Sequence, residues 1–451
     1  MKQQRSKFAN WLRNSITARM LIVGFLLLVL LIPLQFVKSL IQERSYRQVE
    51  VIQEINSKWG NEVLLSGPIL KIPYKTYKEE TEFNKETKKY VKKTETIIRY
   101  AFLFPDKLDI KSNVLSKEEP LKRSIYESVV FTADMQISGN FPKIDLSNND
   151  ILDSDILWEK ISVLIQTSNL KGIRNTVEVN LNSQTLQMNP KYNNDYLNTI
   201  QSGYIKNLFE TSDAAIPFSF NLKVNGSESL KFIPVGKETT AAMNSNWHSP
   251  SFDGNYLPED GSREITETGF KASWKVLQIN RQFEQVFFGS LPNLKPYAFG
   301  AKLIIPVDEY QKSERTAKYG FMVIGLTLLV FLLIQIVSKI YIHPFQYVMI
   351  GLALVMFYTL LISISEHSNF FKAYSIAAIS VLGLITFYSR AILKGFKFPI
   401  LIAASLGGLY SFIYVIIQLE NYALLVGSIG LFVILGIIMF ASRKIDWGNE
   451  Q

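Results

Sequence analysis

Long uncharged apolar runs lie at both ends of the chain, and a polar region lies between them. The segment from Lys339 to His367 reads KIYIHPFQYVMIGLALVMFYTLLISISEH and has no Asp, Glu, Lys or Arg between Lys339 and Glu366. A membrane helix needs about 20 apolar residues, so this run is long enough to cross a bilayer. Similar runs occupy residues 20–37, 319–338, 373–389, 398–419 and 421–442. The pattern predicts six transmembrane helices, one before the polar region and five after it.

Between residues 42 and 318 the hydrophobic period changes to two, as in β-strands. Segments such as LLSGPILKIPYKTY, YESVVFTADMQISG and PFSFNLKVNG alternate, and turn signals such as Asn225-Gly226 separate them. We expect EETEFNKETK at the tip of a hairpin, residues 185–215 in a loop, and AKLIIPVDEY, 301–310, in the last strand. The region therefore predicts a β-sandwich, or a pair of sandwiches.

The two patterns divide the chain into consecutive parts. They are an N-terminal segment, a first transmembrane helix, a β-rich domain, a five-helix transmembrane domain and a tail, at residues 1–19, 20–41, 42–318, 319–442 and 443–451. The predicted fold class is an α-helical transmembrane bundle with a large, mainly antiparallel β domain. Apolar residues at 41, 49, 52 and 55 indicate that the first helix continues beyond the membrane with one apolar face.

The distribution of Lys and Arg predicts the orientation of the helices. Residues 1–19 carry five basic residues and no acid. With the N-terminus in the cytoplasm, the short outer connections hold Glu366 with Lys372, and Glu420. The inner connections and the tail hold Lys339, Arg390, Lys394, Lys397, Arg443 and Lys444. Because cytoplasmic loops carry an excess of Lys and Arg, we expect both termini in the cytoplasm and residues 42–318 on the other side. The excess of Lys and Arg on cytoplasmic loops then accounts for the net charge of +9, which therefore indicates no nucleic-acid partner.

Several kinds of chemistry are excluded. The chain has no cysteine, which rules out disulfides, Cys-based zinc sites and a Cys nucleophile. No GxSxG, HExxH, SxxK or Walker A motif occurs in its required context. His343 and His367 lie at opposite ends of one predicted helix, roughly 35 Å apart at 1.5 Å per residue, so they cannot share a metal ion. The sequence predicts no catalytic, cofactor-binding or metal site, no enzyme activity and no cofactor.

The candidate residues are structural. Trp247 and His248 lie in the aromatic segment SNWHSPSF, which follows a predicted strand. An exposed Trp247 would be costly, so we expect it in the β-core or on the membrane-facing side of the domain. A sharper hypothesis brings His248 to Glu366 and His367, at the end of the long apolar run, as a polar contact between domain and bundle.

Several segments in the same order resemble the CreD family of bacterial inner-membrane proteins. They are LLSGPILKIPY, GSESLKFIPVGKETTAAMNSNWHSPSFDGNYLP, EITETGFKASW, DEYQKSERTAKYGFMVIGLT and HPFQYVMIGLALVMFYTLLISISEH. Where many relatives read SxWPHPSF, this chain places the histidine one position earlier. The resemblance covers nearly the whole chain. It implies a multi-pass inner-membrane protein of cell-envelope integrity with a periplasmic domain, connected with colicin tolerance and a two-component regulatory system, and it supplies no catalytic residue.

Two function classes remain open. In the first, a non-enzymatic envelope protein binds an envelope protein or ligand through its periplasmic domain, while the bundle in the lipid bilayer anchors or transmits. In the second, the chain is an insertase-like or carrier protein, because the one-plus-five layout is similar to that of Gram-negative YidC insertases. Those insertases hold a basic residue in an intramembrane groove, whereas YGFMVIGLTLLVFLLIQIVS has none. A polar cavity in the bundle would favour the second class, and a packed apolar interior the first.

Overall fold

The computed structural model describes residues 15–84, 89–117, 121–123, 125–192, 196–208, 215–305, 309–393, 395–419 and 422–443. The basic residues of segment 1–14, Lys394, Glu420 and Lys444 lie outside these ranges. The chain forms two compact units, one of Met1–Glu50 with Val307–Gln451 and one of Val51–Pro306. We call them the membrane unit and the β-unit. The predicted fold class, a transmembrane bundle with a large, mainly antiparallel β domain, is confirmed.

The described part of the chain contains six helices that are long and apolar enough to cross a membrane, as predicted. They are α2 Ile16–Trp59, α4 Gly320–Ser338, α5 Pro344–Ser365, α6 Phe370–Ile392, α7 Lys397–Gln418 and α8 Ala423–Ser442. A further short helix, α3 Glu309–Lys318, precedes α4. His343 caps α5 by accepting a hydrogen bond from the Phe345 N–H at 3.2 Å, and Pro344 opens the helix, where a missing N–H costs nothing.

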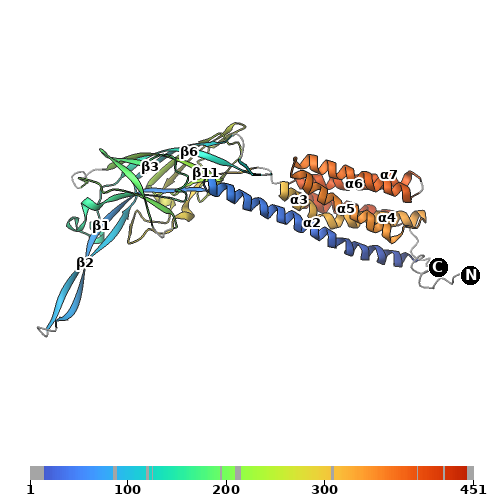
Figure 1. Ribbon diagram of the computed structural model, residues 1–451, viewed down its shortest axis with the longest axis horizontal. Helices are drawn as coiled ribbons and strands as arrows, with labels where there is room; N and C mark the ends of the chain where they lie inside the picture. The colour runs from blue at the N-terminus through green and yellow to red at the C-terminus, as the bar shows by residue number, and fades with distance from the viewer. Residues whose placement is uncertain are drawn as a thin grey trace, which may run out of the picture. The chain divides into compact units, whose positions relative to one another are not determined.

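The first helix is much longer than a membrane span. α2 runs without interruption over 44 residues, with Pro33 inside it (Figure 1). At 1.5 Å per residue it is about 66 Å long, more than twice the hydrocarbon thickness of about 30 Å. The predicted continuation of this helix beyond the membrane segment is therefore confirmed.

Glycines let α2 pack closely in the membrane unit. A Cβ atom at Gly351 of α5 would lie 2.1 Å from a Leu30 methyl carbon, and one at Gly320 of α4 would lie 2.8 Å from a Leu34 methyl carbon. Leu30 and Leu34 are both 2% exposed. Small residues at such positions allow close approach of membrane helices. Each leucine of α2 therefore occupies the space that a side chain at the facing glycine would fill.

The interior of the bundle is filled by aromatic and aliphatic side chains. Phe357 of α5 packs against Tyr374 of α6 and Tyr410 of α7, with ring centroids 5.3 and 4.5 Å apart. The Tyr374 hydroxyl donates to the Tyr410 carbonyl at 2.7 Å, and the Tyr347 hydroxyl donates to Gln335 Oε1 at 2.6 Å. None of the buried residues described in α4 to α7 is charged. The insertase alternative, which expects a basic residue in an intramembrane groove, gains no support.

The β-unit joins most of its strands in one continuous hydrogen-bonded path. The path runs β14-β18-β12-β1-β7-β10-β9-β8-β11-β6-β3-β13-β16-β15, and β2 and β17 branch from β1. Among the strand pairs of the described residues, only β1–β12 and β3–β13 are parallel. The strands are β1 Val63–Asn84, β2 Lys89–Leu103, β3 Lys107–Ser116, β6 Val130–Phe141, β7 Ser162–Thr167, β8 Glu178–Leu181, β9 Gln184–Lys191, β10 Asn198–Ser202, β11 Ile216–Ser227, β12 Ser229–Phe232, β13 Glu238–Ser245, β14 Pro250–Gly254, β15 Glu264–Thr266, β16 Gly269–Leu277, β17 Val286–Phe288 and β18 Phe299–Leu303, with β4 Leu121–Arg123 and β5 Tyr126–Ser128 as a separate pair.

Aromatic side chains bring the two ends of this path together. Phe252 of β14 lies 5.8 Å from Phe270 and 5.9 Å from Trp274, both in β16, between ring centroids. Trp274 also packs against Phe299 of β18 at 5.7 Å. The curved sheet thus encloses a single hydrophobic core. The expected separate sheets of a sandwich are replaced by one barrel-like sheet, whose two ends meet through side-chain packing and not through strand pairing within the described residues.

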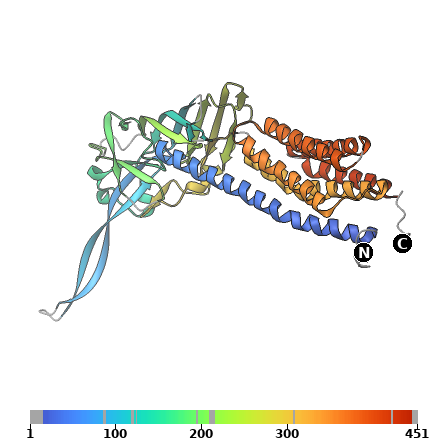
Figure 2. The same cartoon turned by 45° about the vertical axis from the view of Figure 1, so that its right-hand side comes forward.

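Strands β1 and β2 extend beyond the sheet as a two-stranded ribbon (Figures 1 and 2). Their pairing continues from Leu70–Leu103 to Asn84–Lys89, whereas β7 pairs with β1 only as far as Lys71. The sequence predicts EETEFNKETK at the hairpin tip, and this is wrong for EETEF, which belongs to strand β1. Residues 85–88 lie outside the described ranges. The Gly67-Pro68 pair lies at a register shift within β1 and does not end the strand.

Two further sequence expectations are wrong. Residues 185–215, expected in a loop, contain most of β9 and all of β10. Their strand character depends on tertiary contacts, because only a few inward side chains such as Leu186, Met188 and Ile200 are apolar and buried. The expected strand 301–310 ends at Leu303, and Glu309 and Tyr310 begin helix α3. Its buried residues Tyr310, Ser313, Thr316 and Ala317 follow helical spacing.

Candidate functional site

The chain passes between the two units twice, through α2 and through the segment that follows β18 and leads to α3. In each unit, one glutamate contacts both of these connections. Glu366 does so in the membrane unit, and Glu228 does so in the β-unit. We call the groups around them the Glu366 cluster (Glu366, Arg44, Tyr310) and the Glu228 cluster (Glu228, Asn56, Ser128, Leu303).

The Glu366 cluster joins α2, α3 and the end of α5. Glu366 is the C-cap residue of α5, and its Oε1 lies 3.6 Å from Arg44 Nε of α2. The same oxygen accepts a hydrogen bond from the Tyr310 hydroxyl of α3 at 3.3 Å. The Glu366 side chain is 16% exposed and that of Arg44 is 42% exposed, so the carboxylate is the more strongly desolvated partner. One carboxylate thus fixes both connecting helices relative to α5.

The Glu228 cluster fixes the other end of α2. Asn56 donates from Nδ2 to Glu228 Oε1 at 2.7 Å and accepts from the Ser128 hydroxyl at 2.6 Å. The Glu228 carbonyl accepts from the N–H of Leu303, the last residue of β18, at 2.6 Å. Glu228 holds a left-handed backbone with φ of 61°, which costs about 1 kcal/mol or more for a residue other than Gly. These bonds maintain that conformation between β11 and β12.

The last turns of α2 make further contacts in the β-unit. The Trp59 indole N–H donates to the Phe131 carbonyl at 3.2 Å, and the Lys117 ammonium lies 4.1 Å from the centre of the Trp59 ring. Glu54 forms an ion pair with Arg123. The end of α2 is therefore an integral part of the β-unit and not a flexible linker.

The four residues singled out from sequence lie in two places. Trp247 is 8% exposed, and its indole N–H is shared between the carbonyls of Ser249 and Ile304, each at 3.1 Å. Since Ile304 directly follows β18, Trp247 supports the outgoing connection. His248 is exposed beside the Trp247 ring. Glu366 lies in the Glu366 cluster, and His367 is exposed. A contact between His248 and Glu366 stays a prediction.

Sequence reasoning missed Arg44, Tyr310, Asn56 and Glu228. The sequence pattern places Tyr310 in a predicted strand, and no spacing rule connects position 44 with 310 and 366. Asn225 and Gly226, predicted at a turn, lie inside strand β11, and the chain turns at Glu228 between β11 and β12 instead.

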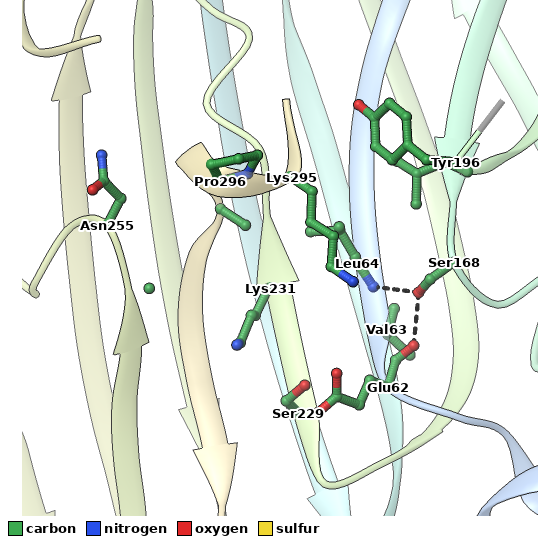
Figure 3. Close-up of a pocket in the computed structure, with 13 residues that line it drawn as sticks. Glu62, Val63, Leu64, Ser168, Tyr196, Ser229, Lys231, Asn255, Lys295 and Pro296 are labelled. Atoms are coloured by element: carbon green, nitrogen blue, oxygen red, sulfur yellow. Dashed lines mark hydrogen bonds between the residues drawn. The ribbon is translucent and has the colours of Figure 1, made fainter. Parts of the chain in front are cut away.

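A cavity of about 300 Å³ opens in the β-unit, where β1 and β18 begin and β7 and β14 end (Figure 3). Ser168 organises one wall, because its hydroxyl accepts from the Leu64 N–H at 2.8 Å and donates to the Glu62 carbonyl at 2.7 Å. Lys231 pairs with Asp253 at 2.6 Å, and this hydrogen bond lowers the pKa of the Asp253 carboxyl. The buried Ser229 hydroxyl has no hydrogen-bond partner among the described residues.

The described residues hold no group of three or more His, Asp or Glu side chains that could bind a metal ion. His343 is occupied in capping α5. The arrangement is therefore one of structural connections and a small polar cavity.

Comparison with known proteins assigns the family. The family profile described as "Inner membrane protein CreD" matches residues 15–448. The inner membrane protein CreD of Escherichia coli (strain K12) is 30% identical over 426 residues, which cover 93% of this chain and 91% of that protein. The match includes both units and the connections between them. The chain belongs to the CreD family of inner membrane proteins.

Proposed function

We propose that this chain is a non-enzymatic protein of the inner membrane that supports cell-envelope integrity. The β-unit binds a component of the periplasm, and the helix bundle anchors the β-unit in the bilayer and receives its conformational state through α2 and α3. The resemblance described above connects this role with colicin tolerance and a two-component regulon.

The observation that carries the proposal is the pair of glutamate clusters. A simple anchor needs one membrane helix and a linker, because one span already inserts effectively irreversibly. Here α2 contacts Glu366 through Arg44 and Glu228 through Asn56, and it is helical between the two contacts. Such rigid elements transmit a displacement that a flexible linker would absorb.

The composition of the bundle supports anchoring and transmission over transport. Ion and substrate paths are marked by charged residues inside the membrane, whereas the described buried residues of α4 to α7 are uncharged.

The test breaks the rigidity of α2 without changing its length. Arg47 and Gln48 lie between the two clusters and have no side-chain partner in the described structure. Replacing both with glycine (Arg47→Gly, Gln48→Gly) weakens the helix by about 1 kcal/mol per residue relative to alanine. The matched control is Arg47→Ala, Gln48→Ala, which removes the same side chains and keeps the helix.

In cells that lack the chain, the alanine pair should restore resistance to detergent and the response to colicin, and the glycine pair should not, at equal membrane levels. Equal complementation by both variants would contradict transmission through α2. The absence of any envelope defect in cells without the chain would contradict the envelope role itself.

A further inference from the structure

We propose that the cavity shown in Figure 3 binds a small zwitterion, namely a free α-amino acid or a dipeptide. The inference rests on the proposed function, because it names the class of periplasmic ligand that the β-unit takes. It is carried by the charges, the unpartnered hydroxyl and the size of the cavity.

The cavity is lined by two charged groups of opposite sign that have no ion-pair partner within the described residues. They are the carboxylate of Glu62, just before β1, and the ammonium of Lys295, in the short helix η6 Lys295–Tyr297. The second ammonium, that of Lys231, is already neutralised by Asp253 at 2.6 Å. One free anion and one free cation in a single cavity match a ligand that carries both an ammonium and a carboxylate.

A buried polar atom points to the same ligand. Ser229 is 1% exposed, and its hydroxyl lacks a partner in the described structure. Leaving a buried hydroxyl unpaired is unfavourable, so a ligand atom that accepts or donates there would be stabilised. In Figure 3 the Glu62 carboxylate is directed toward Ser229. The ligand ammonium would therefore lie between these two groups, and its carboxylate would face Lys295.

The volume of the cavity and its apolar walls limit the length of the ligand and the kind of side chain that it carries. About 300 Å³ is at the lower end of ligand sites, which suits one or two amino-acid residues and excludes a longer chain. Apolar groups of Val63, Leu64, Leu197, Pro296 and Ala298 line the remaining wall. A short aliphatic side chain would contact these groups.

The test uses the full-length chain in detergent. Thermal unfolding, followed by scanning calorimetry, is measured with each of the twenty standard amino acids and with L-alanyl-L-alanine at millimolar concentration. At least one should raise the midpoint. The N-acetyl and methyl-ester derivatives of that compound, which lack the ammonium and the carboxylate, should each bind at least about tenfold more weakly by calorimetry.

Two variants assign the charges. Glu62→Gln should abolish the preference for a free ammonium over the N-acetyl group, and Lys295→Met should abolish the preference for a free carboxylate over the ester. Both side chains are exposed, so folding should be unchanged. Lys160→Met, an exposed lysine outside the cavity, is the matched control and should leave both preferences intact.

The proposal is overturned if no compound binds, if the masked derivatives bind as well as the zwitterion, or if Lys160→Met has the same effect as Lys295→Met. Binding is measured on the purified chain, and transmission is measured in cells. If the purified chain binds the zwitterion but the glycine and alanine pairs complement equally in cells, the proposed function alone is refuted. If the two pairs differ in cells but no compound binds, the ligand alone is refuted.

Discussion

At the scale of single residues, the charges of Glu366 and Arg281, which are largely removed from water, are compensated by different kinds of partner. Glu366 shares one oxygen between a guanidinium and a phenol. Arg281, 5% exposed, forms no ion pair within the described residues. Its Nη1 and Nη2 atoms donate to the carbonyls of Phe283, Val235 and Gly236 and to the Gln285 side chain. Neutral acceptors compensate part of the desolvation, and burial still lowers the pKa of the Arg281 guanidinium to about 10.

The ion pair at Glu366 should show a modest coupling. In a double-mutant cycle of Arg44→Gln and Glu366→Gln, we expect a coupling free energy of about 0.5–1 kcal/mol, because Arg44 is substantially exposed. The measurement is unfolding of the full chain in mixed micelles. Glu43→Gln, an exposed neighbour in α2, is the control for Glu366→Gln and should show no coupling to Arg44→Gln. A coupling free energy of zero for the Arg44–Glu366 pair would show that this ion pair does not stabilise the cluster.

Loss of the Arg281 side chain should destabilise the β-unit strongly. Arg281→Met leaves several buried acceptors without donors, so we expect a loss of about 2–4 kcal/mol. Thermal unfolding by tryptophan fluorescence reports on this unit, which contains Trp59, Trp158, Trp247 and Trp274. Arg263→Met, at an exposed arginine, should be neutral. Burial lowers the pKa of the Arg281 guanidinium in the folded state to about 10, below its ordinary value. The unfolded state therefore binds more protons only above about pH 10, and stability rises with pH only there. An effect of Arg281→Met that varied between pH 6 and 8 would contradict this account.

At the scale of elements, α2 serves two environments. Its N-terminal part packs against glycines of α4 and α5, and its last turns belong to the β-unit through Asn56 and Trp59. The continuity of the helix is therefore a consequence of contacts at both ends, because an isolated helix gains little from propensity alone.

The glycine contact of α2 gives a prediction at this scale. Gly351→Leu would place side-chain atoms where the Leu30 methyl groups lie, and overpacking of this kind costs about 1–3 kcal/mol. The same change at Gly383 of α6, which has no atom within 4 Å of its ideal Cβ position, is the control. Mixed-micelle unfolding should be shifted by Gly351→Leu and not by Gly383→Leu. Leu30→Ala combined with Gly351→Leu should recover part of the loss, and a double variant worse than Gly351→Leu alone would argue against this contact.

At the scale of the whole molecule, six spans and the Lys/Arg asymmetry support a topology with both termini in the cytoplasm. This assignment is part of the proposed function, because the cavity must face the periplasm.

Reporter fusions test the topology. A phosphatase inserted at the exposed turn Asp260-Gly261 should be active, and the same reporter after Gln451 should be inactive. A fluorescent protein that folds only in the cytoplasm should give the opposite pattern at the two positions. The same result at both positions would overturn the topology.

The sequence by itself determined the features that depend on local composition. The run 340–365 has no charged residue and can be stable only in lipid or a buried core, and alternation such as that of YESVVFTADMQISG is compatible with a half-buried strand. The six spans, the long first helix and the mainly antiparallel β domain follow from these periods. The start of α5 at Pro344 also follows, because proline is favoured in the first helical turn.

Tertiary structure alone decided the rest, because the deciding contacts join residues far apart in sequence. β9 and β10 are strands because β8 and β7 offer them edges to pair with, and Tyr310 is helical because its face packs in the membrane unit. The closure of the sheet depends on rings at 252, 270, 274 and 299. Glu366 could be singled out as a charge at the end of an apolar run, but its partners Arg44 and Tyr310 lie 322 and 56 positions away, and no periodicity of 2 or 3.6 residues extends over such separations.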